Sequence, residues 1–246
     1  MGSLQAQISL TDQDWRSAST TQGSAHLGQE MPTSDGKKFR YGKNGTGSGT
    51  ALVAGQLQQG AVVTANHVNR TGVTAAAGVQ TVTFAVGATL VSANQYAQGY
   101  LVVNAGTGAG QILEIAGNTA AGSSGSPTVN LQDAIITATL VSDSKFSLHP
   151  NLYSACIQSS STLAAGVAGV AMTALADASY GWFQTGGPCS VLSDAGAAAV
   201  GAPVTYSDDT PGAVGPYETD AVGPTIGYTM ILGVSAEYRP VFLVIN

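Results

Sequence analysis

The chain has 246 residues, of which 44% are hydrophobic and only 9% charged, and its formal net charge is −6. A typical soluble domain has about 25% charged residues, so this surface is unusually poor in charge, which favours coverage by partner molecules. The acidic balance excludes nucleic acid as a partner, and the most apolar run, residues 163–176, is too short to span a bilayer.

The composition predicts an all-β protein. Thirty-two glycines, with abundant Ala, Thr, Val and Ser, disfavour long exposed helices and fit short strands joined by tight turns. Candidate strands recur every 8–12 residues or so, as in a sandwich or barrel. We expect an extended N-terminal arm with a short hairpin at residues 1–50. A β-rich domain at 51–160 and a C-terminal β-sandwich or barrel domain at 161–246 should follow.

The N-terminal arm contains the candidate partner-binding residues. Residues 1–35 are polar and have no sustained period, so an exposed Trp15 would leave a large apolar surface in water. We therefore expect the arm to lie along neighbouring subunits, with Trp15 in an apolar pocket. Asp35–Gly36 predicts a turn. The basic cluster that follows has two interpretations, a solvated hairpin or electrostatic docking onto an acidic partner surface; it comprises Lys37, Lys38, Arg40 and Lys43.

The middle of the chain has the clearest strand patterns. Residues 79–86 alternate apolar and polar side chains with a period of two. Two apolar runs at 100–104 and 111–116, separated by a glycine-rich turn, predict a hairpin. Further strands are expected at 52–57, 61–64, 128–131, 135–140 and 145–148.

The C-terminal part is organised around Trp182. Residues 164–176 are rich in alanine, but Gly166 and Gly169 disfavour a helix and favour a strand. The stretch 180–192 then predicts a long strand with a Gly-Gly-Pro interruption, with Trp182 at the centre of a small β-core rather than in a binding site. A turn at 208–212 and strands at 225–232 and 241–245 complete this part.

No pattern indicates catalysis. There is no Gly-x-Ser-x-Gly sequence, no metal-binding motif and no phosphate-binding loop, and the three histidines lie far apart in the sequence. We expect no catalytic residue, cofactor or metal, although fourteen acidic residues leave a glycosidase pair open. Asp208 and Asp209 could form an oxygen-ligand cluster with Glu218 and Asp220, but a solvated turn is favoured. Two buried, reduced thiols are favoured over a disulfide for Cys156 and Cys189.

Three segments carry a resemblance to a known family. Residues 35–57, 87–104 and 180–204, with their glycine, aromatic and alternating positions, resemble structural proteins of tailed bacteriophages, in particular capsid decoration (cement) proteins. The similarity covers most of residues 35–246. It implies a protein without enzymatic activity that binds the major capsid protein on the outer surface of the virion after synthesis in the host cytoplasm. It also implies association with copies of itself, for which we expect a trimer.

Other functions stay open at this point. The chain could be another virion component, such as a major capsid, tail or fibre protein, although no long spine helix and no short fixed repeat is visible. It could also be a carbohydrate-binding or carbohydrate-hydrolysing β-sandwich, which would need a groove lined by aromatic residues and two acids. A secreted adhesin would need an export signal, and the N-terminal residues lack one.

Overall fold

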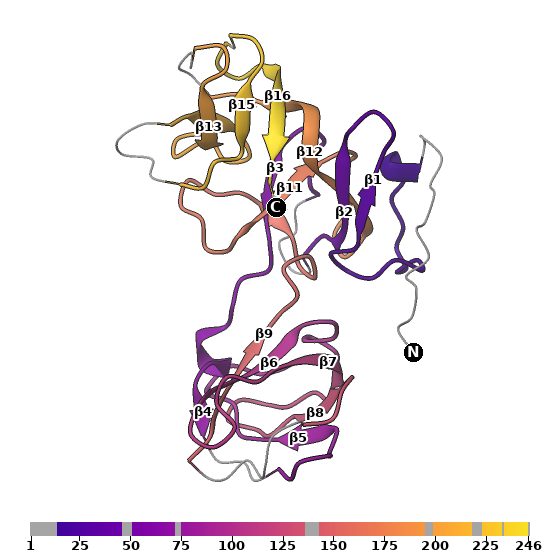
Figure 1. Cartoon of the computed structure of the whole chain (residues 1–246), viewed down its shortest axis with the longest axis vertical. Helices are drawn as coiled ribbons and strands as arrows, with labels where there is room; N and C mark the ends of the chain where they lie inside the picture. Colours follow the sequence, from indigo (N-terminus) through magenta and orange to yellow (C-terminus); the bar gives the residue numbers. More distant parts are fainter. Residues whose placement is uncertain are drawn as a thin grey trace. The chain divides into compact units, whose positions relative to one another are not determined.

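The computed structural model describes residues 14–45, 51–71, 75–135, 143–194, 199–217, 223–232 and 234–245. The chain forms two compact units, the first made of residues 1–61 and 152–246 and the second of residues 62–151 (Figure 1). The second unit is therefore an insertion into the first. This division differs from the consecutive domains 51–160 and 161–246 expected from the sequence, because strands on both sides of the insertion share one sheet.

The first unit is a curled antiparallel sheet. β3 comes from before the insertion, and it pairs with β10 and β11, which come from after it. A short 3-10 turn, η1 (Asp14–Arg16), precedes the sheet. The strands of this unit are β1 (Glu30–Pro32), β2 (Lys38–Lys43), β3 (Leu57–Gln59), β10 (Ile157–Gln158), β11 (Val167–Ala171), β12 (Tyr180–Leu192), β13 (Pro203–Tyr206), β14 (Val214–Pro216), β15 (Gly227–Thr229) and β16 (Tyr238–Val244).

The long strand β12 connects the parts of this sheet. Its first half pairs with β2, its second half pairs with β16, and β11 pairs with it at Phe183 and Gln184. Side chains of β12 alternate between the two faces, so that Cys189 and Val191 are buried while Pro188 is exposed. This period of two is what an antiparallel sheet with one covered face requires.

Trp182 is buried in a small aromatic cluster, as expected. Its exposed fraction is 5%, and its ring lies 5.1 Å from that of Tyr41 on β2, with an angle of 59° between the planes. Phe39 and Met31 complete the cluster from β2 and β1. The aromatic residues thereby attach the β1–β2 hairpin to the rest of the sheet, so described residues 14–45 are part of the first unit.

The second unit is a six-stranded, curled antiparallel sheet with the order β4-β9-β6-β7-β8-β5. The 3-10 turn η2 (Ala65–His67) leads into it. Its core is formed by side chains at alternating, inward-facing positions of β5 to β9 and of the segments next to them, and the rings of Phe84 and Phe146 stack there with 5.5 Å between their centres. The strands are β4 (Arg70–Thr71), β5 (Thr81–Thr83), β6 (Tyr100–Ala105), β7 (Ile112–Asn118), β8 (Thr128–Leu131) and β9 (Lys145–His149).

The structure confirms the all-β class and most of the expected strands. The hairpin of β6 and β7, the strand β11 and the turn after Asp35 lie where the sequence predicts them. Residues 61–64, in contrast, form no strand, and strand pairing around residues 79–86 is limited to β5. The expected alternation of buried and exposed side chains around β5 is present, since Val82, Phe84 and Val86 are all buried. Most of the strand expected at 135–140 lies outside the described residues.

Candidate binding surfaces

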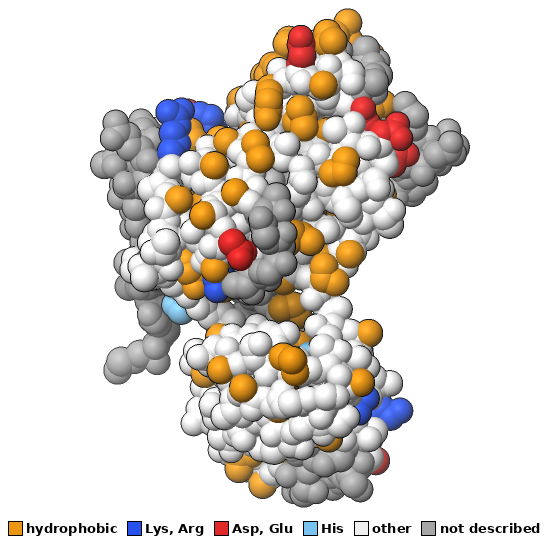
Figure 2. All heavy atoms as spheres, turned by 180° about the vertical axis from the view of Figure 1, so that it is seen from behind, with side chains coloured by type: hydrophobic (Ala, Val, Ile, Leu, Met, Phe, Trp, Pro, Cys, Tyr) orange, Lys and Arg blue, Asp and Glu red, His pale blue; other side chains and the backbone are white. Residues whose placement is uncertain are grey.

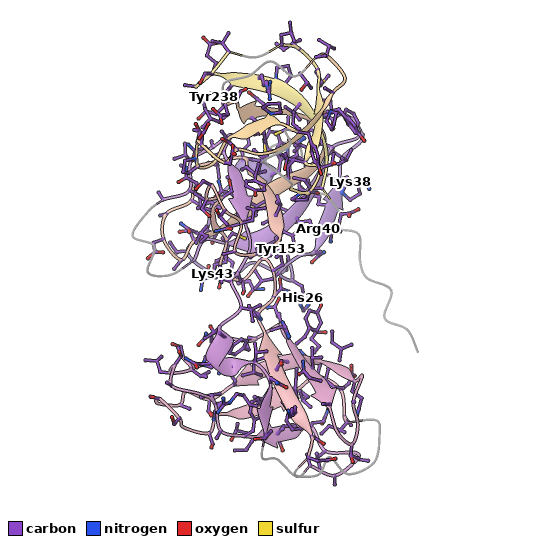
Figure 3. The ribbon with its side chains drawn as sticks, turned by 90° about the vertical axis from the view of Figure 1, so that its left-hand side faces the viewer. His26, Lys38, Arg40, Lys43, Tyr153 and Tyr238 are labelled. Atoms are coloured by element: carbon purple, nitrogen blue, oxygen red, sulfur yellow. The ribbon has the colours of Figure 1, made fainter. Side chains whose placement is uncertain are left out.

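The basic cluster lies on β2, where Lys38, Arg40 and Lys43 can be followed in Figure 3. Phe39 and Tyr41 point into the core between them, so Lys38 and Arg40 are on the outer face of this strand. The turn between β1 and β2 carries Lys37. The structure therefore brings all four basic side chains to one hairpin, as the sequence suggests.

Acids of the same chain neutralise two of these cations. Lys37 forms an ion pair with Asp35, and an Nη atom of Arg40 lies 3.0 Å from a carboxylate oxygen of Glu30. Arg40 also donates a hydrogen bond of 2.8 Å to the carbonyl of Gly28. The hydrogen bond from Lys37 is the main cause that lowers the pKa of the exposed Asp35 to about 2, with help from Thr33. Two of the four cations are thus already paired.

The other two cations differ from each other. Lys38 is exposed, whereas the Lys43 ammonium group lies over the ring of Tyr180, 5.4 Å from its centre. A cation–π contact of this kind is weak at an exposed site and leaves the ammonium group available to water. Lys38 and Lys43 are therefore the members of the cluster best placed to attract an acidic partner.

Trp15 is half-buried against its own chain. Its ring stacks on that of Phe39 with 5.3 Å between the ring centres, and the guanidinium carbon of Arg16 lies 4.2 Å from the centre of the Trp15 ring. The expected apolar environment for Trp15 thus exists within one chain. Residues 1–13 lie outside the described residues.

A cluster of three carboxylates lies at the turn before β14. Ligand atoms of Asp194, Asp208 and Asp209 lie within 4.8 Å of one another. Asp194 is almost buried and accepts hydrogen bonds from the hydroxyl groups of Ser207 and Thr210. The sequence suggested Glu218 and Asp220 as partners for this turn, but they lie outside the described residues, and it gave no signal for Asp194. These hydrogen bonds within the turn account for the burial of the Asp194 carboxylate without a metal ion.

The nucleophilic and titratable groups in the interior are well shielded. Cys156 and Cys189 are free and buried, and burial raises the pKa of both thiols, that of Cys189 to about 12. Their thiols are therefore poor nucleophiles at neutral pH. His67 is fully buried, with Nδ1 2.5 Å from the Tyr96 hydroxyl and Nε2 2.9 Å from the Thr89 carbonyl.

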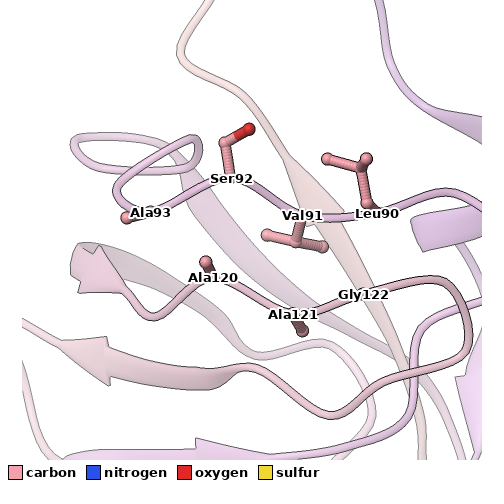
Figure 4. Close-up of a pocket in the computed structure, with 7 residues that line it drawn as sticks. All are labelled: Leu90, Val91, Ser92, Ala93, Ala120, Ala121 and Gly122. Atoms are coloured by element: carbon pink, nitrogen blue, oxygen red, sulfur yellow. The ribbon is translucent and has the colours of Figure 1, made fainter.

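A shallow depression of about 460 Å³ lies on the second unit (Figure 4). Two segments whose backbones pair at Val91 and Ala121 form it. Only the Ser92 hydroxyl is a polar side chain among the lining residues, which are Leu90, Val91, Ser92, Ala93, Ala120, Ala121 and Gly122. This set offers apolar contact but no general acid, general base or metal ligand.

Sequence reasoning missed an exposed apolar surface on the first unit. The strand β16 has inward-facing Val241 and Leu243, yet its outward-facing Tyr238, Phe242 and Val244 are also apolar. Hydrophobic side chains are scattered over the face seen in Figure 2, where charged groups are few. The sequence of β16, which is largely apolar at both its odd and its even positions, could have predicted this surface. One face of such a strand packs on the core, and the other is available to a second surface.

None of the helices in the described part of the chain has the length and apolar character needed to cross a membrane. The chain was compared with protein-family models, with curated proteins and with solved structures, and none of them matches it.

Proposed function

We propose that this protein is a structural virion protein that binds the outer surface of a phage head and stabilises it. The observation that carries the proposal is a surface rich in exposed large hydrophobic side chains and poor in charge, on an all-β scaffold. In a monomer such a surface stays in contact with water, which is unfavourable, whereas a protein covered by its neighbours on a particle buries it. The resemblance of most of residues 35–246 to decoration proteins supports the same role.

The basic hairpin supplies a second element of the proposal. Lys38 and Lys43 form no ion pair with an acid among the described residues, so we place them against an acidic patch of the major capsid protein. Lys37 and Arg40 contribute less, because Asp35 and Glu30 already pair with them. Exposed charges act over about 8–10 Å at moderate salt, so this contact should weaken as salt is raised.

The proposal is tested with heads of the virus that encodes the chain, prepared without this protein. Added protein should sediment with the heads to a saturable level and raise the temperature at which they release DNA. A Lys38→Ala/Lys43→Ala variant should bind more weakly and lose part of the salt dependence, while Lys145→Ala on the second unit should bind like the unmodified protein. Heads that bind no protein would refute the function, and an unchanged salt response would refute the docking role of the two lysines.

A further inference from the structure

The outer side of β16 and its neighbours forms one apolar surface. Half of the exposed large hydrophobic side chains that the structure describes, eight of sixteen, lie between Tyr228 and Val244. Along β16 the core-facing and outward-facing positions alternate, and both sets are largely apolar. We call the outward set, with its neighbours on β12, on β15 and directly after β15, the outer apolar face: Pro188, Tyr228, Met230, Tyr238, Phe242 and Val244.

The strand register makes this face continuous. Phe242 pairs with Pro188 of β12 on one side and with Tyr228 of β15 on the other. Tyr228 in turn pairs with the exposed Pro203 of β13, so an apolar row crosses four strands. Side chains directly opposite each other on one face are in contact distance, which turns four separate residues into one surface.

The outer apolar face carries no charge of its own. The outward positions of β12 in this region are Gly186, Pro188, Ser190 and Leu192, and those of β16 are equally uncharged. Charged residues are found at the margin, where the exposed Glu237 precedes Tyr238 and Lys38 pairs with Gly186. An uncharged apolar centre with charged residues at its margin is the usual arrangement of a protein–protein interface.

The size of the face fits an interface between two proteins. Tyr228, Tyr238 and Phe242 are 44%, 49% and 45% exposed, and Ile231 and Leu232, next to Met230, are 52% and 59% exposed. With about 150–250 Å² for a whole aromatic side chain and less for an aliphatic one, these five residues together with Pro188, Met230 and Val244 present on the order of 500–700 Å². A stable interface buries about 800 Å² on each partner, and a free monomer rarely exposes an apolar patch larger than a few hundred Å².

We propose that the occupant of this face is the same face of a second copy of the chain. A surface without charge has no electrostatic preference for a different partner, and a row of proline and aromatic side chains is complementary to itself across a two-fold axis. Two sheets can pack face to face at about 10 Å, as in a β-sandwich. The inference rests on the proposed function, and it replaces the trimer expected from the resemblance by a two-fold pair. Within the first unit, Tyr238 lies far from Lys43, so self-association leaves the Lys43 end of β2 available (Figure 3).

Sedimentation of the full chain over a range of concentrations tests the contact. The unmodified protein should associate, and Tyr228→Arg/Phe242→Arg should remain monomeric because four guanidinium groups would meet in the interface of each pair. The matched control is Tyr100→Arg/Ile112→Arg, since these side chains are 41% and 64% exposed on strands of the second unit. The control should associate like the unmodified protein, and circular dichroism should report the same fold for all three.

A second measurement does not depend on disruptive substitutions. Ser190 is exposed on the outward side of β12, and both native cysteines are buried. The thiol of Ser190→Cys should react with a maleimide several-fold more slowly at concentrations at which the protein is associated. The rate for Thr81→Cys, at an exposed position of the second unit, should not change with concentration. Equal protection of both thiols, or of neither, would overturn the inference.

The outcomes separate this inference from the proposed function. Unmodified protein that stays monomeric overturns the inference, whether or not it binds heads. If such a monomer binds heads and Tyr228→Arg/Phe242→Arg does not, the capsid protein occupies the face instead. Association that is lost only in the Tyr228→Arg/Phe242→Arg variant, in a protein that fails to bind heads, would support the contact and refute the function.

Discussion

Trp15 stacks on Phe39 with 5.3 Å between the ring centres and 18° between the ring planes. Phe39 is fully buried on β2, which pairs with β12, so the stack attaches the N-terminal segment to the central strand of its own unit. The apolar area of Trp15 is thereby covered in part without a neighbouring subunit. This contact within one chain gives Trp15 a structural role that does not require assembly with other subunits.

Replacing Trp15 by alanine tests the structural role. Loss of the stack and of the apolar contact should lower the free energy of unfolding by about 1–3 kcal/mol. Val53→Ala, at an exposed position of the same unit, should stay within about 0.5 kcal/mol of the unmodified protein. Urea unfolding measures both. A Trp15→Ala protein of unchanged stability that no longer associates would show that the tryptophan acts between chains.

The ion pair of Asp35 and Lys37 predicts a pH effect. The pKa of Asp35 is lowered from 3.8 to about 2, mainly by the hydrogen bond from Lys37. A lowered folded-state pKa means that the stabilising contribution is complete above about 3.8 and is lost as the pH falls through about 2. Carboxyl chemical shifts followed by NMR should show the low pKa. Lys37→Met should raise it, whereas Lys38→Met should change it little.

Gly169 is required where β11 approaches β12. Its φ is +131°, and an added Cβ would lie 2.7 Å from the Gln184 carbonyl oxygen. Gly169→Ala should therefore destabilise the first unit by about 2–4 kcal/mol, through both backbone strain and the close contact. Gly122→Ala provides the control, since no atom lies within 4 Å of the added Cβ. Equal melting temperatures for the two variants would contradict this prediction.

The hydrogen bond between His67 and Tyr96 stabilises the second unit. The Thr89 carbonyl can only accept a hydrogen bond, so Nε2 of His67 donates to it, and Nδ1 shares a hydrogen bond with the Tyr96 hydroxyl. Tyr96→Phe leaves a buried nitrogen without this partner and should cost about 1–3 kcal/mol in the free energy of unfolding. Tyr100→Phe, on the exposed side of β6, should cost much less. Denaturant titration compares the two variants.

Arg239 is the exception on the core side of β16. It is 2% exposed, burial lowers its pKa, and within the described part of the chain its Nε and both Nη atoms have no hydrogen-bond partner. A buried unpaired cation is costly, so Arg239→Met should be neutral or raise the free energy of unfolding by about 1–4 kcal/mol. Val241→Ala, its neighbour on the same face, should instead destabilise by about 1–3 kcal/mol. A strongly destabilised Arg239→Met protein would indicate that the guanidinium group is paired in solution.

Local patterns in the sequence predict much of this fold. The glycine-rich turn between two apolar runs predicts the hairpin of β6 and β7, and Asp35–Gly36 predicts the turn between β1 and β2. The size of Trp182 predicts its burial. These features depend on neighbouring residues, on backbone preferences and on the burial of large apolar side chains, all of which the sequence contains.

Tertiary structure decided the rest. The sheet of the first unit joins β3 to β10 and β11 across the insertion of residues 62–151, a pairing that no local pattern specifies. It also brought Asp194 to Asp208 and Asp209, and it placed Arg239 on the core side of β16. Contacts between distant segments depend on which strands pair at the sheet edges. The sum of many weak contacts over the whole fold determines that pairing, so it cannot be read from any one segment. For the same reason, the row from Pro188 through Phe242 to Tyr228 exists only in the folded chain.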